Sequence, residues 1–133
     1  MRGTTVGIIG YGHIGREVAR RCKAFDMTVM ALSRKVRQEP GIIDWYGTVK
    51  DLDELLTKSD FVINCAPGGQ ETRNMINKHC FSIMKPDSII ANVGRGEVIQ
   101  EEALYEALST RRIRGGIIDV WYNFPSKINS NPW

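Results

Sequence analysis

The sequence predicts an α/β fold, a doubly wound parallel sheet with helices on both faces. Two observations lead to this prediction. Apolar runs of four to six residues alternate along the chain with amphipathic segments of helical spacing, and a glycine-rich turn joins the first such pair. Short apolar runs are typical of buried parallel strands, and strands that alternate with helices favour a parallel sheet.

The first strand is predicted at residues 6–9, and a G-x-G-x-x-G turn follows it at Gly10, Gly12 and Gly15. Gly10 would allow the tight turn, Gly12 would let the backbone approach a pyrophosphate, and Gly15 would let helix and strand pack closely. The phosphates would meet the free N–H groups at the start of the next helix. An apolar face of that helix is predicted from four residues: Ile14, Val18, Cys22 and Phe25. Strand, turn and helix together favour a Rossmann-type dinucleotide site over a merely glycine-rich turn.

The later elements repeat this alternation. Strands are predicted at residues 28–32, 61–64, 88–93 and 113–120, with a possible short strand at 47–49. Helices are predicted between Asp51 and Ser59, from Asn77 to Met84, and from Gln100 to Thr110. Ligands of such sheets bind at the carboxyl ends of the strands, and polar and glycine residues cluster at those ends here.

Composition limits the class of protein. The chain is 42% hydrophobic and 25% charged, with a net charge of +3, which is too small and dispersed to indicate nucleic acid binding. Cys22, Cys65 and Cys80 form no C-x-x-C pair and no metal-ligand spacing, so we expect reduced thiols and no metal site. No signal peptide or membrane span is visible, and we expect a cytoplasmic protein.

The end of the second strand bears on the choice of dinucleotide. An acidic residue about 20 residues beyond the glycines normally binds the ribose of NAD. Ser33 stands there, 18 residues after Gly15, and Arg34, Lys35 and Arg37 follow. A hydroxyl beside a guanidinium suits a 2′-phosphate, so Ser33 and Arg34 favour NADP over NAD. Two alternatives stay open, in which the basic loop is only solvated or Arg34 stacks on the adenine.

Four stretches in succession carry a wider resemblance. They are VGIIGYGHIG at residues 6–15, LDELLTKSDFVINCAP at 52–67, the segment MIN to YEAL at 75–108, and IRGGIIDVW at 113–121. With them, the chain resembles the coenzyme-binding domain of the D-isomer-specific 2-hydroxyacid dehydrogenases. The resemblance implies that residues 1–133 are a dinucleotide-binding domain, a fragment without the family's second, substrate-facing domain.

The resemblance also implies site residues. Arg95, between Gly94 and Gly96, matches the arginine that grips the substrate's carboxylate and keto oxygen, where a fixed guanidinium stabilises developing charge. Asp119 matches the residue that accepts a hydrogen bond from the nicotinamide carboxamide. The alternatives are a surface ion pair for Arg95 and a cap or turn role for Asp119. The remaining matched cofactor-binding positions are His13, Ile14, Ala66, Pro67, Thr72, Asn92 and Val93.

The family's acid/base is a histidine bonded to a glutamate, and this pair is not found in the chain. The histidine's segment falls beyond the last residue, and neither His13 nor His79 matches it. Phe124 stands at the glutamate position and cannot accept a hydrogen bond. The parent enzyme would then orient its histidine through Tyr122 or Asn123, or its chemistry would be slower or altered.

A second departure follows Pro67. The family's usual Leu-Thr is replaced by Gly68-Gly69, which we expect to remove a hydroxyl near the phosphates and to loosen that loop.

These observations predict a domain of an oxidoreductase that transfers hydride between NAD(P) and a small 2-keto or 2-hydroxy acid, similar to glyoxylate or hydroxypyruvate reductases. The alternative is a dinucleotide-sensing interaction module resembling the family's corepressors, which Arg95 disfavours because a sensor has less need of a carboxylate clamp. A third hypothesis, formate oxidation, is disfavoured because formate dehydrogenases carry a glutamine at the position of Phe124. No nucleic acid or membrane partner is expected. We expect a homodimer, with Trp45, Tyr46, Trp121 and Trp133 as candidate contacts.

Overall fold

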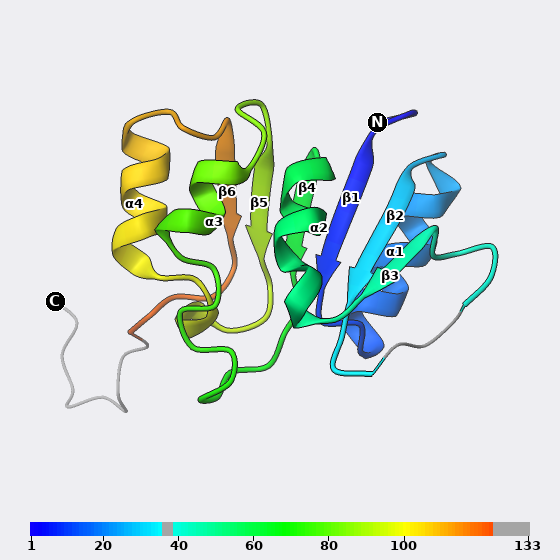
Figure 1. Cartoon of the computed structure of the whole chain (residues 1–133), viewed down its shortest axis with the longest axis horizontal. Coiled ribbons are helices and arrows are strands. Elements are labelled where there is room, and N and C mark those ends of the chain that lie inside the picture. The colour runs from blue at the N-terminus through cyan, green and yellow to red at the C-terminus, as the bar shows by residue number, and fades with distance from the viewer. Residues whose placement is uncertain (36–38, 124–133) are drawn as a thin grey trace, which may run out of the picture.

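The computed structural model describes residues 1–35 and 39–123, which form a parallel sheet flanked by helices (Figure 1). The strands are β1 (Thr5–Ile9), β2 (Thr28–Leu32), β3 (Trp45–Gly47), β4 (Phe61–Asn64), β5 (Ile89–Asn92) and β6 (Gly115–Ile118). The α-helices are α1 (His13–Ala24), α2 (Leu52–Lys58), α3 (Lys78–Ile83) and α4 (Glu101–Ser109), and η1 (Val49–Asp51) and η2 (Gly96–Val98) are short 3-10 helices.

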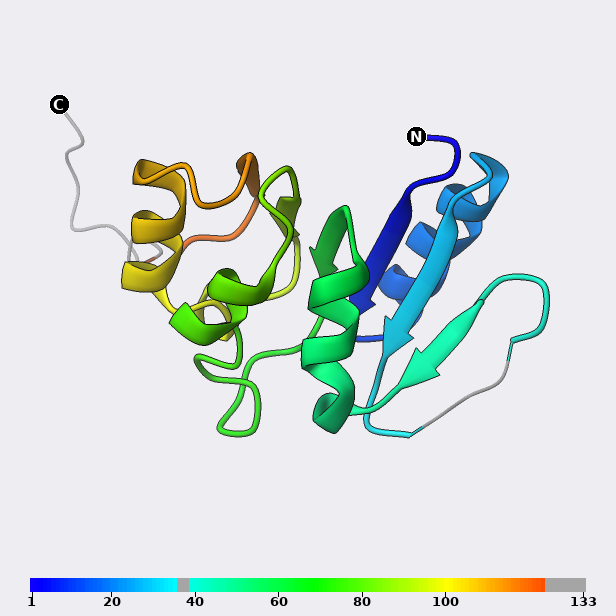
Figure 2. The same cartoon turned by 45° about the horizontal axis from the view of Figure 1, so that its top comes forward.

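The strand order is β3-β2-β1-β4-β5-β6, and every neighbouring pair is parallel. The chain therefore proceeds outward from β1 in one direction and from β4 in the other, which places a topological switch point between β1 and β4. Helix α1 covers one face of the sheet, while α2, α3 and α4 cover the opposite face (Figures 1 and 2). The predicted doubly wound architecture is confirmed.

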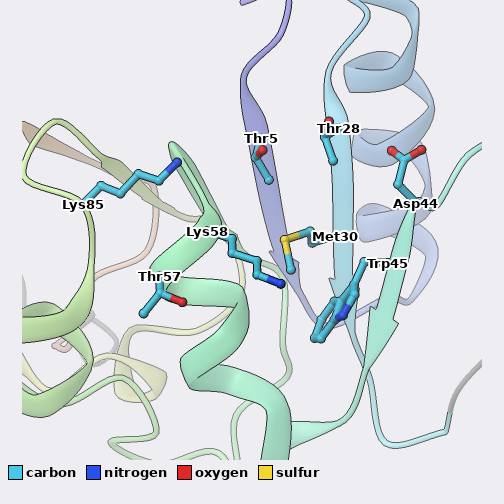
Figure 3. A pocket seen from close by; sticks show the side chains of 8 residues that line it. All are labelled: Thr5, Thr28, Met30, Asp44, Trp45, Thr57, Lys58 and Lys85. Atoms are coloured by element: carbon cyan, nitrogen blue, oxygen red, sulfur yellow. The ribbon is translucent and has the colours of Figure 1, made fainter.

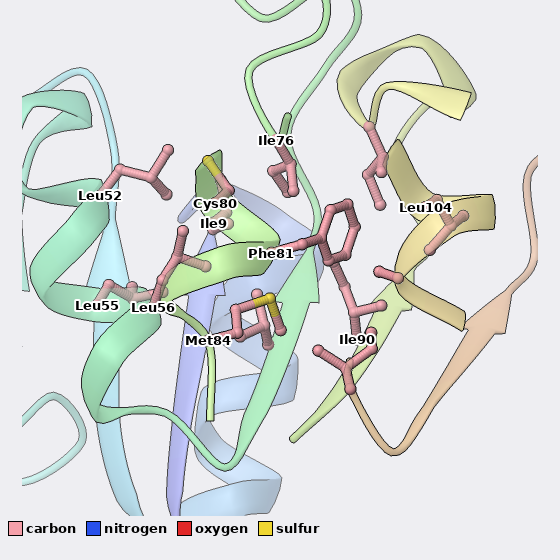
Figure 4. Close-up of a cluster of buried hydrophobic side chains, with 14 of the residues drawn as sticks. Ile9, Leu52, Leu55, Leu56, Ile76, Cys80, Phe81, Met84, Ile90 and Leu104 are labelled. Atoms are coloured by element: carbon pink, nitrogen blue, oxygen red, sulfur yellow. The ribbon is translucent and has the colours of Figure 1, made fainter. Parts of the chain in front are cut away.

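Two apolar clusters hold these layers together. On the face of α2, α3 and α4, Leu55, Leu56, Phe81, Met84 and Ile90 are at most 2% exposed and pack together (Figure 4). On the other face, the second cluster joins α1 to the first two strands. Five of its residues are fully buried: Val6, Ile8, Ala19, Val29 and Ala31. Burial of such side chains contributes about 1.5–3 kcal/mol for each large aliphatic residue.

The predicted apolar face of α1 is wrong at both ends. Ile14 is 57% exposed and Phe25 is 58% exposed, whereas Gly15 and Ala19 are buried. The helix lies so close to the sheet that a Cβ on Gly15 would overlap the Gly10 carbonyl oxygen. Small residues, Gly15 and Ala19, therefore form the face of α1 that packs on the sheet. Ile14 lies outside this face, and Phe25 comes after the last helical residue.

The strand boundaries differ most from the prediction at β3 and β6, and by single residues at β1 and β5. The short strand expected at 47–49 is β3, which ends at Gly47. Thr48 is the N-cap of η1, and its backbone N–H donates to the Asp51 carboxylate over 2.8 Å. Strand β6 spans Gly115–Ile118 instead of 113–120, since the pairing with β5 reaches only from Ile89 to Asn92. In the part of the chain that the structure describes, none of the helices is long and apolar enough to cross a bilayer.

Candidate functional site

The carboxyl ends of the parallel strands lie along one edge of the sheet (Figure 1). This edge carries the glycine turn after β1, Ser33 after β2, Ala66 after β4, and Arg95 after β5. Asp119 directly follows β6, and its backbone N–H donates to the Asn92 carbonyl over 3.0 Å. The residues that the sequence singled out are thus brought to one edge, beside the switch point between β1 and β4.

The three glycines of the turn differ in what the fold requires of them. Gly10 has φ +93°, and a Cβ there would lie 2.6 Å from the Ala66 backbone nitrogen. Gly15 is equally constrained by the close contact of α1 with the turn. Gly12 has an ordinary extended conformation, with φ −97° and ψ −153°, and a Cβ there would meet nothing within 4 Å. Neither the backbone nor the packing requires glycine at position 12.

Gly12 is also the N-cap of α1, and it makes no side-chain cap. His13 and Ile14 follow it with exposed side chains, so the first backbone N–H groups of this 12-residue helix face the edge without a capping side chain. Such a terminus combines unpaired donors with the positive end of the helix dipole and suits an anion. The backbone N–H of His13 is one of the groups at this helix start, and its side chain is exposed.

At the end of β2, Ser33 is held by two contacts. Its hydroxyl donates to the Lys35 carbonyl over 2.6 Å, so the phenol of Tyr46, 2.8 Å away, is the donor in the second hydrogen bond. Arg34 and Lys35 are exposed. Arg37 lies outside the described residues. Two exposed cations thus lie at this end of the edge, beside a hydroxyl whose proton is donated to the Lys35 carbonyl.

An acidic residue that the sequence did not single out lies close to the glycine turn. The Glu39 carboxylate accepts hydrogen bonds from the Tyr11 phenol, from Arg16 over 3.2 Å and from Arg20 over 3.4 Å. The bonds from Tyr11 and Arg16 hold the pKa of Glu39 below its usual value. Burial, followed by the bond to Glu39, raises the pKa of Tyr11.

Tyr11 also packs edge-on against Tyr46, with ring centroids 5.5 Å apart. Side chains from the turn, α1 and β3 are therefore linked at the β2 end. The spacing of Arg16 and Arg20, one helical turn apart, was the only local sign of this cluster.

Two buried asparagines fix the ends of β4 and β5. Asn64 donates through Nδ2 to Asn92 Oδ1 over 2.8 Å, and its own Oδ1 accepts from the Ala66 backbone over 3.1 Å. Asn92 Oδ1 accepts from Gly94 over 3.2 Å, and its Nδ2 donates to the Arg95 carbonyl over 3.1 Å. Both residues are at most 1% exposed. Because each partner is satisfied, this network fixes the two loops rigidly.

The glycines on either side of Arg95 allow close backbone contact. A Cβ on Gly94 would lie 2.5 Å from the Ala66 carbonyl oxygen, and one on Gly96 would lie 2.7 Å from the Trp121 carbonyl oxygen. Arg95 itself is exposed, and its Nη1 donates to the Gly94 carbonyl over 2.9 Å. Backbone packing fixes the turn, while the Arg95 side chain is exposed at the edge.

The loop after Pro67 is bound to the Arg95 turn, contrary to the expected loosening by Gly68-Gly69. The Gly69 N–H donates to Glu97 Oε1 over 2.9 Å, and Thr72 donates its hydroxyl proton to the Pro67 carbonyl over 2.7 Å. Glu97 was not singled out from the sequence, which offers no local signal for a contact across 28 positions. The Glu97 carboxylate, from the turn after β5, thus supplies an acceptor for the backbone of the loop after Pro67.

Several other expectations concern single residues. His79 is an exposed surface residue, with Nε2 2.9 Å from Asp53. Val93 is half-buried, and its N–H donates to the Asn64 carbonyl over 3.0 Å. Burial raises the pKa of Tyr122 to about 12, so its phenol is protonated at neutral pH. Phe124 lies outside the described residues, as does Trp133.

The three cysteines are free, and burial raises the pKa of the Cys65 thiol to about 11. A thiol so protonated at neutral pH is a poor nucleophile. Within the described residues, no three His, Cys, Asp or Glu side chains come together as metal ligands.

A groove of about 500 Å³ lies away from this edge (Figure 3). Thr5 and Thr28, which line it, are the first residues of β1 and β2, so the groove is at the amino ends of the strands. Its two lysines are already paired, Lys58 with Glu54 over 2.6 Å and Lys85 with Asp60 over 2.8 Å. The groove and the carboxyl edge are therefore separate features.

Comparisons with known proteins agree with this description. A glyoxylate reductase from Thermococcus gammatolerans is 42% identical over 123 residues, which are 92% of this chain and 36% of the reductase. The NADPH-dependent glyoxylate/hydroxypyruvate reductase of Sinorhizobium meliloti, solved with NADP, superimposes with a TM-score of 0.84 at 28% identity, covering 96% of this chain and 41% of that one. The NAD-dependent formate dehydrogenase of Staphylococcus aureus, solved with NAD, superimposes with a TM-score of 0.85 at 34% identity. The match covers 94% of this chain and 37% of that one.

The parallel sheet and the glycine turn at its carboxyl edge define the class of protein, which is a dinucleotide-binding domain of the Rossmann type. The family follows from a profile described as "D-isomer specific 2-hydroxyacid dehydrogenase, NAD binding domain", which matches residues 1–133. The chain belongs to this family, and it spans about a third of the length of the glyoxylate reductase that it resembles.

Proposed function

We propose that this domain binds NADP(H) at the carboxyl edge and serves an oxidoreductase that reduces a small 2-keto acid to the 2-hydroxy acid. Gly12 is the observation that carries the proposal. The conformation and packing of the turn explain Gly10 and Gly15 but leave Gly12 without a structural reason. Open space in front of Gly12, at an uncapped helix N-terminus, fits a pyrophosphate held by backbone N–H groups.

The preference for NADP rests on the β2 end. Arg34 would bind the 2′-phosphate, with Lys35 adding positive charge. Ser33 would donate to the same phosphate by exchanging its hydrogen bond to the Lys35 carbonyl. No acidic residue occupies this place to accept ribose hydroxyls. Glu39 does not replace that acid, because its carboxylate is already taken by Tyr11, Arg16 and Arg20. Relatives bind either cofactor, as the two solved complexes show for their own proteins.

The nicotinamide would supply the hydride donor or acceptor, and this chain would supply orientation and charge. Ala66, Pro67, Thr72, Asn92 and Val93 would line the cofactor through backbone and packing. Asp119 would accept a hydrogen bond from the carboxamide and so select the face of the ring. Arg95 would hold the substrate carboxylate and stabilise negative charge on the keto oxygen. Its exposed guanidinium on a rigid turn suits that role.

The complete reaction needs more than these residues. We propose that a second, substrate-facing domain supplies the acid/base histidine, in keeping with the greater length of the relatives. We further propose a cytoplasmic homodimer.

The test is calorimetric titration of the 133-residue chain with NADPH and with NADH at fixed salt. We expect NADPH to bind at least tenfold more tightly, a difference of about 1.4 kcal/mol. Arg34→Ala should remove most of that preference, whereas Arg114→Ala, an exposed arginine before β6, should leave it unchanged. Equal binding of the two cofactors by the unaltered chain would overturn the NADP assignment.

Gly12→Ala tests the phosphate site itself. Its Cβ meets no protein atom, so the free energy of unfolding should be unchanged within about 0.5 kcal/mol. The affinity for both dinucleotides should nevertheless fall at least tenfold, because the methyl group occupies the space of the pyrophosphate. If the unaltered chain binds neither dinucleotide, or if Gly12→Ala binds them equally well, the proposed site is wrong.

A further inference from the structure

Two loops of the carboxyl edge are joined by one side chain. Residues 67–74 form the loop after β4, and Glu97 lies two residues after Arg95 in the loop after β5. Glu97 Oε1 accepts the backbone N–H of Gly69 over 2.9 Å, and Oε2 pairs with Arg73 Nη2 over 2.9 Å. The backbone adds a third link, since the Glu97 carbonyl accepts from Asn74 over 2.8 Å.

Gly68 leaves the room that this carboxylate occupies. A Cβ at position 68 would overlap Glu97 Oε1 and would lie 3.2 Å from Arg95 Cγ. Any side chain there would displace Glu97, Arg95 or both. Gly69 has φ +141°, a conformation that other residues rarely adopt, and this conformation accompanies the donation of its N–H to the carboxylate. The Gly68-Gly69 pair and Glu97 are therefore structurally dependent on each other.

The connection through Glu97 bears on ligand binding, because both loops contain residues that we assign to ligands. One loop contains Pro67 and Thr72, which we assign to the cofactor, and the other contains Arg95, which we assign to the substrate. The Glu97 side chain is 38% exposed, so its ion pair with Arg73 contributes little to stability in water. The backbone hydrogen bond to Gly69, in contrast, fixes the position of the loop next to the dinucleotide.

We infer that Glu97 is a positioning residue: its carboxylate, in the space left by Gly68, holds the cofactor-facing loop of residues 67–74 against the Arg95 turn. This inference rests on the proposed function. It does not follow from the glycine turn or from Arg95, and it assigns a role to a side chain that would contact neither ligand directly. The role is to set the loop geometry before the dinucleotide arrives, which lowers the cost of ordering the loop on binding.

The test is a double-mutant cycle on the 133-residue chain, read as the dissociation constant for NADPH. Glu97→Ala should weaken binding about fivefold, because the loop loses its acceptor. Gly68→Ala should weaken binding by a similar factor, since its methyl group displaces the same carboxylate. The double variant should bind about as well as either single variant, because both changes break one link.

Glu97→Gln separates positioning from general destabilisation. Its amide oxygen still accepts from Gly69, so we expect NADPH binding within twofold of the unaltered chain although the charge on residue 97 is lost. Arg73→Ala should likewise have little effect. Unaltered NADPH binding by Glu97→Ala would overturn the inference, and so would full additivity of the two changes or equal losses for Glu97→Gln and Glu97→Ala.

These outcomes are distinct from failure of the proposed function. If the unaltered chain binds neither dinucleotide, the site assignment fails and the inference fails with it. If the unaltered chain binds NADPH, and Glu97→Ala, Gly68→Ala and the double variant bind it equally well, only the role of Glu97 is wrong.

Discussion

The two ends of the carboxyl edge are held in different ways. At the β2 end, the contacts are made by side chains: Tyr46 donates to Ser33, and Glu39 accepts from Tyr11 and two arginines. At the β5 end, Gly94 allows the backbone to approach Ala66 closely, and buried amides fix the loops. The first end is held by partly buried contacts between phenols and charged side chains, and the second by backbone packed against backbone.

This difference suggests what each end can tolerate. A single side-chain hydrogen bond contributes about 1 kcal/mol to stability, so the β2 end can lose one without loss of the fold. A methyl group forced between two backbone segments has no room to relax. We therefore expect substitutions at the β5 end to reduce stability, and substitutions at the β2 end to change the choice of cofactor.

Gly94→Ala should give the largest effect. The new methyl group would lie 2.5 Å from the Ala66 carbonyl oxygen, and relief requires a backbone shift that disturbs the asparagine network. We expect the free energy of unfolding to fall by about 2–3 kcal/mol, measured by urea denaturation. Gly115→Ala is the control, because its Cβ would meet nothing within 4 Å. Equal stability of the two variants would show that the β5 end is less rigid than described.

Tyr46→Phe should give a smaller effect, confined to the cofactor. It removes the hydrogen bond to Ser33 but keeps the ring that packs on Tyr11. We expect NADPH binding to weaken by about 1 kcal/mol with little change for NADH. Tyr105→Phe, at a position 75% exposed on α4, serves as the control. An equal loss for both cofactors would mean that Ser33 does not contact the 2′-phosphate.

Glu39→Gln should give the smallest effect, and one that depends on pH. Hydrogen bonds from Tyr11 and Arg16 lower the pKa of Glu39 in the folded protein. A depressed folded pKa stabilises the protein above the unfolded value of about 4.3 and loses that contribution as the pH falls through the folded value. The difference in urea midpoint between the unaltered chain and Glu39→Gln should therefore be present at pH 7 and shrink below about pH 4. A difference independent of pH would exclude an ionic contribution.

The sequence predicted the fold well because its signals are local. The apolar run before Gly10 and the amphipathic segment after Gly15 identify strand, turn and helix without any distant residue. The outer residues of α1 were predicted wrongly for a related reason. Helical spacing counts apolar residues but does not show how close the helix lies to the sheet, and that closeness buries Ala19 instead of Ile14.

The candidate site was predictable only in part. Residues named by a motif, such as Gly12, Arg95 and Asp119, lie at the predicted edge. Glu39 and Glu97 were missed because their partners are distant in sequence and no spacing rule connects them.

The sequence by itself determined the order of strands and helices, the glycine turn and the family, because short-range patterns of burial and backbone freedom encode them. The tertiary structure alone decided which side chains support the site. The contacts Tyr11–Glu39, Asn64–Asn92 and Gly69–Glu97 each span 28 positions and form only when separate loops meet at the sheet edge. Such contacts depend on the three-dimensional positions of both partners, and the spacing of residues along the sequence does not indicate which distant residues meet.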